Sequence, residues 1–259
     1  MKLKFPPELL LDSVRNLART NALKALGRVI SGGIDLIFPV FCQGCGREGW
    51  YLCLACQTLI EAPIHRCLVC GKNSPLGQIH SECQSKKIGL TGLMIAAEYR
   101  APAVRNLIWH LKYNSVKDIS KTLALLMADF LANNDLVDYF AQSIVVAVPI
   151  HASRFRFRGF NQSMEIASQL AKNLGMEMTA LLSKTKNTTR QVELTRDARL
   201  ENIKNTFAVD PRFDGEKLRG RKILLIDDVA TTGATLNECA LTLKQFAPAE
   251  IWGLVVARN

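Results

Sequence analysis

Two adjacent aspartates, Asp227 and Asp228, follow an apolar run and precede a turn of small and hydroxyl-bearing residues. Residues 223–235 read ILLIDDVATTGAT. The apolar run is typical of a strand, and the carboxyl end of a strand is where open α/β sheets usually bind ligands. Carboxylates at this place can accept hydrogen bonds from the 2′- and 3′-hydroxyls of a ribose. The pair therefore predicts a sugar-binding end of a strand.

The turn after the aspartates can surround a phosphate. Its backbone N–H groups, three threonine hydroxyls and the positive N-terminal end of the next helix all attract an anion. Gly233 supplies a position without a Cβ, where the backbone can approach the anion closely. The expected phosphate-binding residues are Ala230, Thr231, Thr232, Gly233, Ala234 and Thr235. The whole segment predicts a ribose 5-phosphate site, and the alternative is a buried strand ending in a solvated turn.

Seven of the eight cysteines fall between Cys42 and Cys83, as three C-x-x-C pairs and a fourth pair, His80-x-x-Cys83, in which histidine leads. Pairing each C-x-x-C-G knuckle with the next pair predicts two four-ligand zinc sites of closed, structural type. The first comprises Cys42, Cys45, Cys53 and Cys56, and the second comprises Cys67, Cys70, His80 and Cys83. A cross-braced arrangement would use the same ligands, and His65 competes with His80 because it lies beside Cys67.

Disulfide bonds and redox activity account for the cysteine pattern less well than zinc binding does. Disulfides are rare at C-x-x-C spacing in a cytosolic chain, and a redox pair would account for one pair but not four. Cys239 lies far along the chain in a predicted helix, so we expect a core thiol there.

A basic and aromatic segment, SRFRFRGFNQS, lies shortly after the apolar run at 144–148. If it is extended, Arg154, Arg156 and Arg158 share one face and the intervening phenylalanines share the other. Such a face suits a pyrophosphate, or a nucleic-acid backbone with stacked bases. The alternative is a solvated loop.

Residues 184–207 are polar and basic, and they predict either a lid over the ligand or a surface loop. Its candidate ligand contacts are Arg190, Gln191 and Arg199.

The elements that must position these residues alternate between strands and helices. We expect strands at 93–99, 144–148, 223–226 and 251–257, and helices at 103–113, 117–132, 163–174 and 234–246. This alternation predicts an α/β fold with a mainly parallel sheet and helices on both faces. The predicted organisation is an amphipathic helical segment at 1–37, a small double zinc ribbon at 38–88 and the α/β domain at 89–259.

The amino-acid composition indicates anionic ligands or partners but does not distinguish among them. The formal net charge is +10, which fits polyphosphate ligands, single-stranded nucleic acid or an anionic membrane surface. The segment 1–37 could lie on a membrane, although packing on its own protein is the preferred interpretation. No long apolar stretch and no secretory signal are recognised, so we expect a cytoplasmic protein.

Taken together, these motifs carry a family resemblance. Residues 223–235 resemble the phosphoribosyl-pyrophosphate (PRPP) loop of type I phosphoribosyltransferases. From about Leu36 onward the chain resembles the ComF family, in which a double zinc ribbon precedes such a domain. The matching segments are CQGCG, CLVCG, LIWHLKY at 107–113, RFRGFNQS at 156–163, RLENIKNTF at 199–207 and the PRPP loop. His80 departs from the pattern, since a cysteine is more typical there.

The resemblance implies Zn²⁺ in two structural sites and Mg²⁺ bound with PRPP. Asp227 and Asp228 would hold the ribose hydroxyls, residues 230–235 the 5′-phosphate, and Lys112 with the arginines of 154–158 the departing pyrophosphate. It also implies a link to DNA uptake and to single-stranded DNA. Two hypotheses follow: a phosphoribosyltransferase of unknown acceptor, or a non-catalytic nucleic-acid-handling protein that keeps the PRPP fold as a scaffold.

Overall fold

The computed structural model describes residues 39–85, 87–114, 116–186 and 205–259. The predicted helical segment 1–37 and the predicted lid residues Arg190, Gln191 and Arg199 lie outside the described residues. In the part that is described, no helix is both long and apolar enough to cross a membrane.

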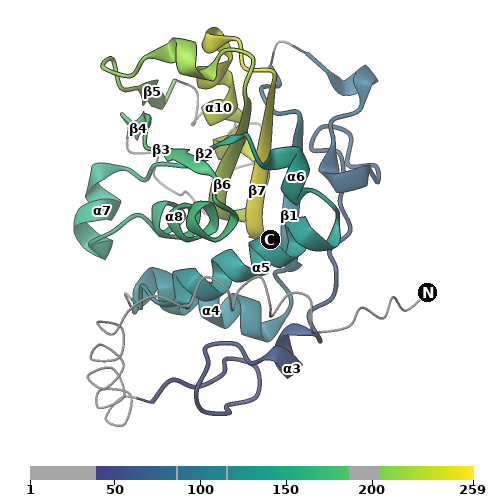
Figure 1. Ribbon diagram of the computed structural model, residues 1–259, viewed down its shortest axis with the longest axis vertical. Helices are drawn as coiled ribbons and strands as arrows, with labels where there is room; N and C mark the ends of the chain where they lie inside the picture. The colour runs from purple at the N-terminus through teal and green to yellow at the C-terminus, as the bar shows by residue number, and fades with distance from the viewer. Residues whose placement is uncertain (1–38, 86, 115, 187–204) are drawn as a thin grey trace.

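Five parallel strands form the main sheet, in the order β1-β7-β6-β2-β3 (Figure 1). Their bounds are β1 Gly92–Glu98, β2 Ile144–Ala147, β3 Glu177–Thr179, β6 Lys222–Ala230 and β7 Glu250–Arg258. The central strands are apolar on both faces, as parallel strands are when helices cover both sides. The predicted fold class is therefore confirmed.

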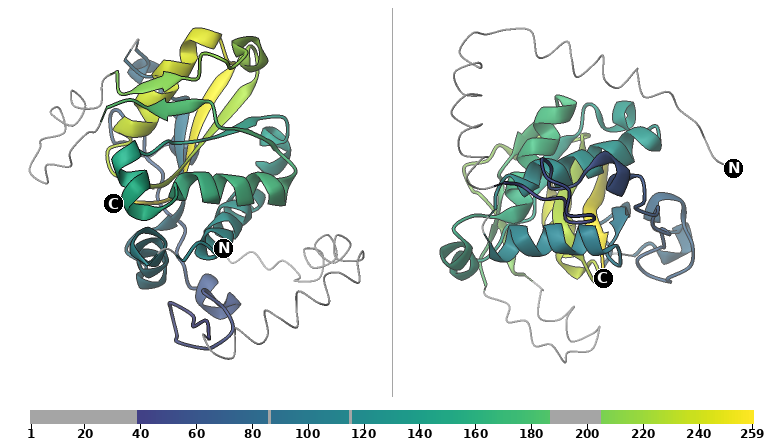
Figure 2. Two further views of the ribbon diagram at one scale, coloured as in Figure 1. Left: turned by 90° about the vertical axis from the view of Figure 1, so that its left-hand side faces the viewer. Right: turned by 90° about the horizontal axis from the view of Figure 1, so that it is seen from below.

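The two faces of the sheet pack against different helices. Leu224 and Ile226 of β6 point into a core shared with α4, α5 and α8, whereas Ile223 and Leu225 point into a core shared with α10. The helices are α4 Pro102–Tyr113, α5 Ile119–Asn133, α6 Val137–Phe140, α7 Ala152–Arg158, α8 Gln162–Leu174 and α10 Ala234–Leu243. Helix α8 crosses one face of the sheet in the left view of Figure 2.

The strand that carries the two aspartates is longer than predicted. Pairing with β7 continues through Asp227, Val229 and Ala230, so β6 ends at Ala230 and not at Ile226. The predicted helix 234–246 ends earlier, at Leu243, and a 3₁₀ turn η4, Lys244–Phe246, follows it. Because β6 continues past the aspartates, their side chains point to opposite faces of the sheet.

The strand order places a ligand crevice at the ends of β2 and β6. From β2 the chain passes through α8 to β3 on one side, and from β6 it passes through α10 to β7 on the other side. Two crossovers that leave neighbouring strands in opposite directions open a crevice at their carboxyl ends, which is where open α/β sheets bind ligands.

Three short strands of the described part were not predicted. Strand β3 extends the main sheet, and β4 Leu182–Lys184 pairs antiparallel with β5 Phe207–Val209 in a two-stranded sheet. The strand pair β4–β5 flanks the segment 187–204 and shares the core on the α10 side through Leu182 and Phe207.

The two cysteine segments pack on different parts of the α/β domain. The first contains the short helix α3 Leu54–Gln57 and lies near α4 and α5, while the second, with 3₁₀ turns η1 Pro75–Gly77 and η2 Ser81–Cys83, lies beside β1 (Figure 1). Leu52 joins the core of α4 and α5, and Leu68 joins the core of α10. Each segment therefore adds to one of the two cores of the sheet.

Candidate functional site

Asp227 sits at the carboxyl end of β6 with its side chain half-buried. Its Oδ1 accepts a hydrogen bond from the Ser163 hydroxyl at 2.7 Å and one from the Asp228 backbone N–H at 2.9 Å. Ser163 lies in the first turn of α8. This helix follows β2 and α7 in the chain, and β2 is the strand next to β6. The start of α8 thus fixes the orientation of one carboxylate in the crevice.

Asp228 points to the other face of the sheet and pairs with Lys112. The Lys112 Nζ lies 2.9 Å from Asp228 Oδ2, and the two side chains are 14% and 11% exposed. Lys112 belongs to the last turn of α4. The sequence analysis assigned this lysine to a pyrophosphate, whereas here its ammonium compensates the charge of a buried carboxylate.

Burial, and then the negative charge of Asp228, raises the pKa of Asp227 from 3.8 to about 7. A carboxylate whose folded pKa is raised contributes stability at low pH that is lost as pH rises through that pKa. Asp227→Asn, which keeps the Oδ1 acceptor, should therefore stabilise the ligand-free protein at pH 8 by about 1–3 kcal/mol. Urea unfolding at pH 8 and pH 5 measures this, and the gain should shrink at pH 5. An equal gain at both pH values would contradict the ionisation of Asp227.

The turn between β6 and α10 presents the donors that a phosphate needs. Gly233 is the N-cap of α10 with a φ of +74° and has no side chain that could cap the helix. The Ala234 N–H donates to Thr232 Oγ1 at 3.4 Å, so a threonine hydroxyl lies at this helix end. Thr231 is exposed, and Thr232 and Thr235 are half-buried. Arg258 Nε holds the Thr231 carbonyl at 3.0 Å. The predicted phosphate-binding residues therefore lie together at one helix end, apart from Ala230, which is the last residue of β6.

The arginine segment is helical, and the prediction of one extended arginine face is wrong. His151 caps α7 by accepting a hydrogen bond from the Ser153 N–H, and Gly159 ends the helix with a φ of +78°. At about 100° per residue, positions two apart do not share a helix face. Arg156 is exposed, whereas Arg158 donates to Gln162 at 3.0 Å. The arginines therefore cannot act as one row.

A further cation that the sequence analysis missed lies beside the carboxylates. Lys184, at the end of β4, is half-buried. Burial lowers the pKa of Lys184 and the charge of Arg154 lowers it further, while Asp227 opposes both. Lys184 is thus close enough to Arg154 and to Asp227 for its charge to interact with each of them. No signal in the sequence singled out Lys184, because the three-residue strand that positions it was not recognised.

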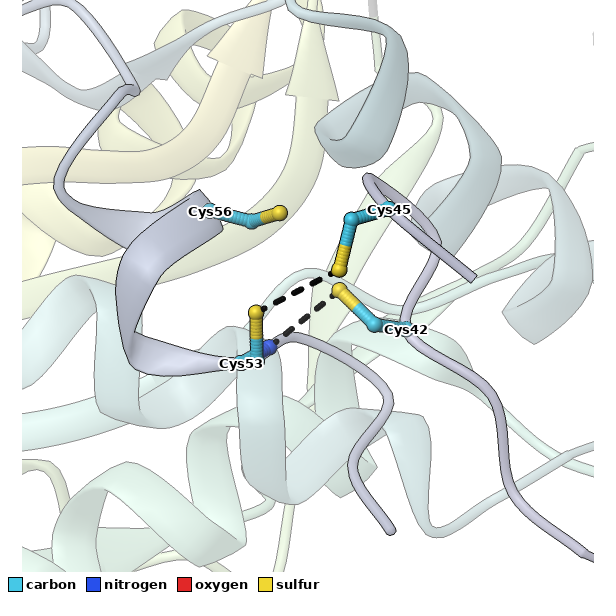
Figure 3. Close-up of side chains that lie close together, drawn as sticks. All are labelled: Cys42, Cys45, Cys53 and Cys56. Atoms are coloured by element: carbon cyan, nitrogen blue, oxygen red, sulfur yellow. Dashed lines mark hydrogen bonds between the residues drawn. The ribbon is translucent and has the colours of Figure 1, made fainter. Parts of the chain in front are cut away.

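The first cysteine group is assembled as predicted (Figure 3). The sulfur atoms of Cys42, Cys45, Cys53 and Cys56 point toward a common centre, and the potential ligand atoms lie within 4.8 Å of one another. The Cys53 N–H donates to Cys42 Sγ at 3.3 Å. Four convergent sulfurs with backbone donors are typical of a Zn²⁺ site.

The second group also forms in chain order, so the cross-braced alternative is excluded. Cys67, Cys70, His80 and Cys83 bring their ligand atoms within 4.8 Å of one another. His65 has a different role, since its Nε2 accepts the Ile95 N–H of the edge strand β1 at 3.0 Å. His80 is therefore the fourth residue of this group, as predicted.

The protonation of the thiols fits a bound cation. Burial opposes ionisation of Cys42, yet N–H groups of Cys53, Cys45 and Gly44 together lower its pKa to about 6. Hydrogen bonds with Cys45 and Cys53 raise the pKa of Cys56 to about 12. A thiolate is the zinc-binding form, and a bound cation would offset the charge of Cys42, which contributes to the raised pKa of Cys56.

Comparison with known proteins identifies a known domain in the second half of the chain. The phosphoribosyl transferase domain family matches residues 161–259. Competence protein F of Haemophilus influenzae is 29% identical over 213 residues, covering 80% of this chain and 90% of that protein. DNA utilization protein YhgH of Escherichia coli K12 is 29% identical over 214 residues, covering 79% and 90%.

Competence protein ComFC of Bacillus subtilis is 21% identical over 198 residues and covers 74% of this chain and 77% of that protein. Matches of this length extend beyond the transferase domain alone. The chain is therefore similar over most of its length to competence and DNA utilization proteins, and its residues 161–259 match the phosphoribosyl transferase domain family.

Proposed function

We propose that the protein binds Mg·PRPP at the carboxyl ends of β2 and β6 and is a phosphoribosyltransferase whose acceptor is unknown. The observation that carries this proposal is the joining of two adjacent carboxylates to a threonine-rich helix N-terminus within nine residues of chain, 227–235. A sugar with a phosphate on one side and hydroxyls on the other matches this order of donors and acceptors.

Each part of the site would hold one part of PRPP. Asp227 and Asp228 would accept hydrogen bonds from the ribose hydroxyls, and Thr231 to Thr235 would bind the 5′-phosphate. Lys184 would lie near the pyrophosphate because its charge interacts with that of Asp227, and Arg154 would lie near Lys184 because these two charges also interact. Lys112 would move from Asp228 toward the pyrophosphate, or would stay and fix that carboxylate.

The donor set fits Mg²⁺. This ion prefers oxygen ligands and is usually held by one or two carboxylates together with substrate phosphates. Asp227 and Asp228 supply such oxygens, and the ion would spread the negative charge that develops on the departing pyrophosphate. Displacement of pyrophosphate at C1′ passes through an oxocarbenium-like state, so these residues would act mainly by positioning and by charge stabilisation.

Turnover tests the enzymatic part of the proposal. Incubation of the protein with Mg·PRPP and candidate nucleobases, or with a cell extract, should release pyrophosphate faster than an Asp227→Asn, Asp228→Asn variant does. Binding of Mg·PRPP without any release above that variant would remove the enzymatic part and leave the binding site.

The cellular role is proposed from the named relatives. A competence protein and a DNA utilization protein among them support a link to DNA uptake, with the DNA-uptake machinery as a partner. We place the protein in the cytoplasm, where PRPP is available.

An exposed aromatic and basic surface favours single-stranded nucleic acid as a second candidate ligand. Phe157 is 82% exposed, and Trp109 and Tyr113 of α4 are each more than half exposed. The Arg158 guanidinium lies 5.7 Å from the Tyr113 ring centroid, so α4 and α7 share this surface. Exposed rings beside cations are what base stacking and phosphate contacts require.

Arg156→Glu tests the second candidate, because Arg156 is exposed, whereas Arg154 and Arg158 interact with other residues. The variant should weaken binding of a fluorescent single-stranded oligonucleotide and reduce the salt slope by about one. Lys217→Glu, which reverses a charge of the same sign at an exposed position in the 3₁₀ turn η3 Gly215–Leu218, is the control. Equal binding by both variants would exclude α7 from a nucleic-acid surface.

A further inference from the structure

A leucine of the second cysteine segment lies directly on the phosphate-binding turn. A Cβ added at Gly233 would come within 2.7 Å of Leu68 Cδ1 and 3.3 Å of Leu93 Cδ2. Leu68 is 6% exposed, and the core that contains it also contains Ala230 and Leu236, which flank the turn. The Leu68 side chain thus packs against the turn at Gly233.

The position of Leu68 depends on the metal group around it. Leu68 follows Cys67 and precedes Cys70, two of the four potential ligands. The Cys67 carbonyl accepts the Gly71 N–H at 3.0 Å, which closes the knuckle between these ligands. A metal held by the four residues would therefore fix the backbone on both sides of Leu68.

The same segment is attached to the helix that follows the turn. The Asn237 side chain of α10 accepts the Gly89 N–H and donates to the Lys87 carbonyl, each at 2.9 Å. Lys244 Nζ adds a bond to the Ile88 carbonyl at 2.7 Å. Residues 87–89 come four to six residues after Cys83, so the segment that follows the second cysteine group contacts both α10, at Asn237, and the turn η4 after it, at Lys244.

We infer that Leu68 is a positioning residue for the 5′-phosphate, through which the second metal group sets the shape of the phosphate-binding turn. The second zinc ribbon then has a role in ligand binding besides stability. The first ribbon has no equivalent role at this turn, because its Leu52 packs into the core of α4 and α5. This inference rests on the proposed ribose 5-phosphate site.

The test compares truncation of the two leucines. Leu68→Ala and Leu52→Ala both shorten a buried leucine next to a cysteine ligand, at 6% and 7% exposure. Zinc content, thermal stability and calorimetric affinities for ribose 5-phosphate and for Mg·pyrophosphate are measured on the full-length, zinc-loaded chain. Leu68→Met, which conserves volume, tests whether shape is what matters. If Leu68→Ala does not fold, Leu68→Val takes its place.

Leu68→Ala should lose about tenfold or more in affinity for ribose 5-phosphate, because small displacements of binding groups have large effects. Its zinc content and its affinity for Mg·pyrophosphate should stay at the wild-type values, and Leu52→Ala and Leu68→Met should bind ribose 5-phosphate normally. Unchanged affinity of Leu68→Ala for ribose 5-phosphate, or equal losses of affinity for ribose 5-phosphate and Mg·pyrophosphate, would overturn the inference. Either result would still be compatible with the proposed ribose 5-phosphate site. Absence of binding by the wild type would instead overturn the proposed function together with the inference.

Discussion

Replacing both Asp227 and Asp228 by asparagine is expected to abolish binding of Mg·PRPP while the protein stays folded. Each carboxylate would lose a charged hydrogen bond to the ribose hydroxyls and an oxygen close to the magnesium ion. Two such interactions are together worth about 3–6 kcal/mol, so affinity should fall by about 100-fold or more. Calorimetric titration measures the affinity, and circular dichroism checks the fold.

The single variants separate the two aspartates. Asp228→Asn leaves the Lys112 ammonium without its partner in a largely buried place, so it should destabilise the protein by about 3 kcal/mol. Asp227→Asn should stabilise the ligand-free protein at pH 8, because the raised pKa of Asp227 means that its ionised form is unfavourable in the folded state. Asp118→Asn with Asp138→Asn removes two exposed carboxylates elsewhere and is the charge-matched control. Wild-type affinity in the Asp227, Asp228 double variant would exclude the ribose-binding assignment.

The purified chain is expected to contain about two zinc ions, one in each cysteine group. Cys42→Ser and Cys67→Ser should each reduce the zinc content by one. Structural zinc contributes about 10–16 kcal/mol in small zinc domains, so removal of both ions by a strong chelator should unfold the cysteine segments. Elemental analysis and thermal unfolding, each before and after chelation, make the measurement.

Cys239→Ala is the matched control for the zinc experiment. Cys239 is fully buried in α10 and belongs to neither group. This variant should retain two zinc ions, with only a modest loss of stability from the smaller side chain. A wild-type content of one ion or none would refute the two-site arrangement.

The long buried elements could be predicted from the sequence because their signals are local. Residues 144–147 belong to a continuous apolar run that ends at Pro149, which is typical of a central parallel strand. The two cysteine groups could also be predicted, since zinc ligands recur at fixed spacing. The position of the aspartates followed from the apolar run before them.

Other features depend on contacts between distant residues and could not be predicted. The Lys112–Asp228 ion pair joins α4 to β6 across more than a hundred residues. The alternation of arginine and phenylalanine in α7 imitates a strand, although Gly159 marks a helix end. Strand β4, which positions Lys184, is too short to show a period. The contact of Leu68 with Gly233 likewise appears only once the chain is folded.

The most direct measurement is a calorimetric titration of the zinc-loaded, wild-type protein with Mg·PRPP. Saturable binding of one PRPP per chain, lost in the Asp227, Asp228 double variant, is the result expected from the geometry of residues 227–235. Absence of binding at millimolar PRPP would contradict a ribose 5-phosphate site and would leave the exposed surface of α4 and α7 as the candidate ligand-binding surface.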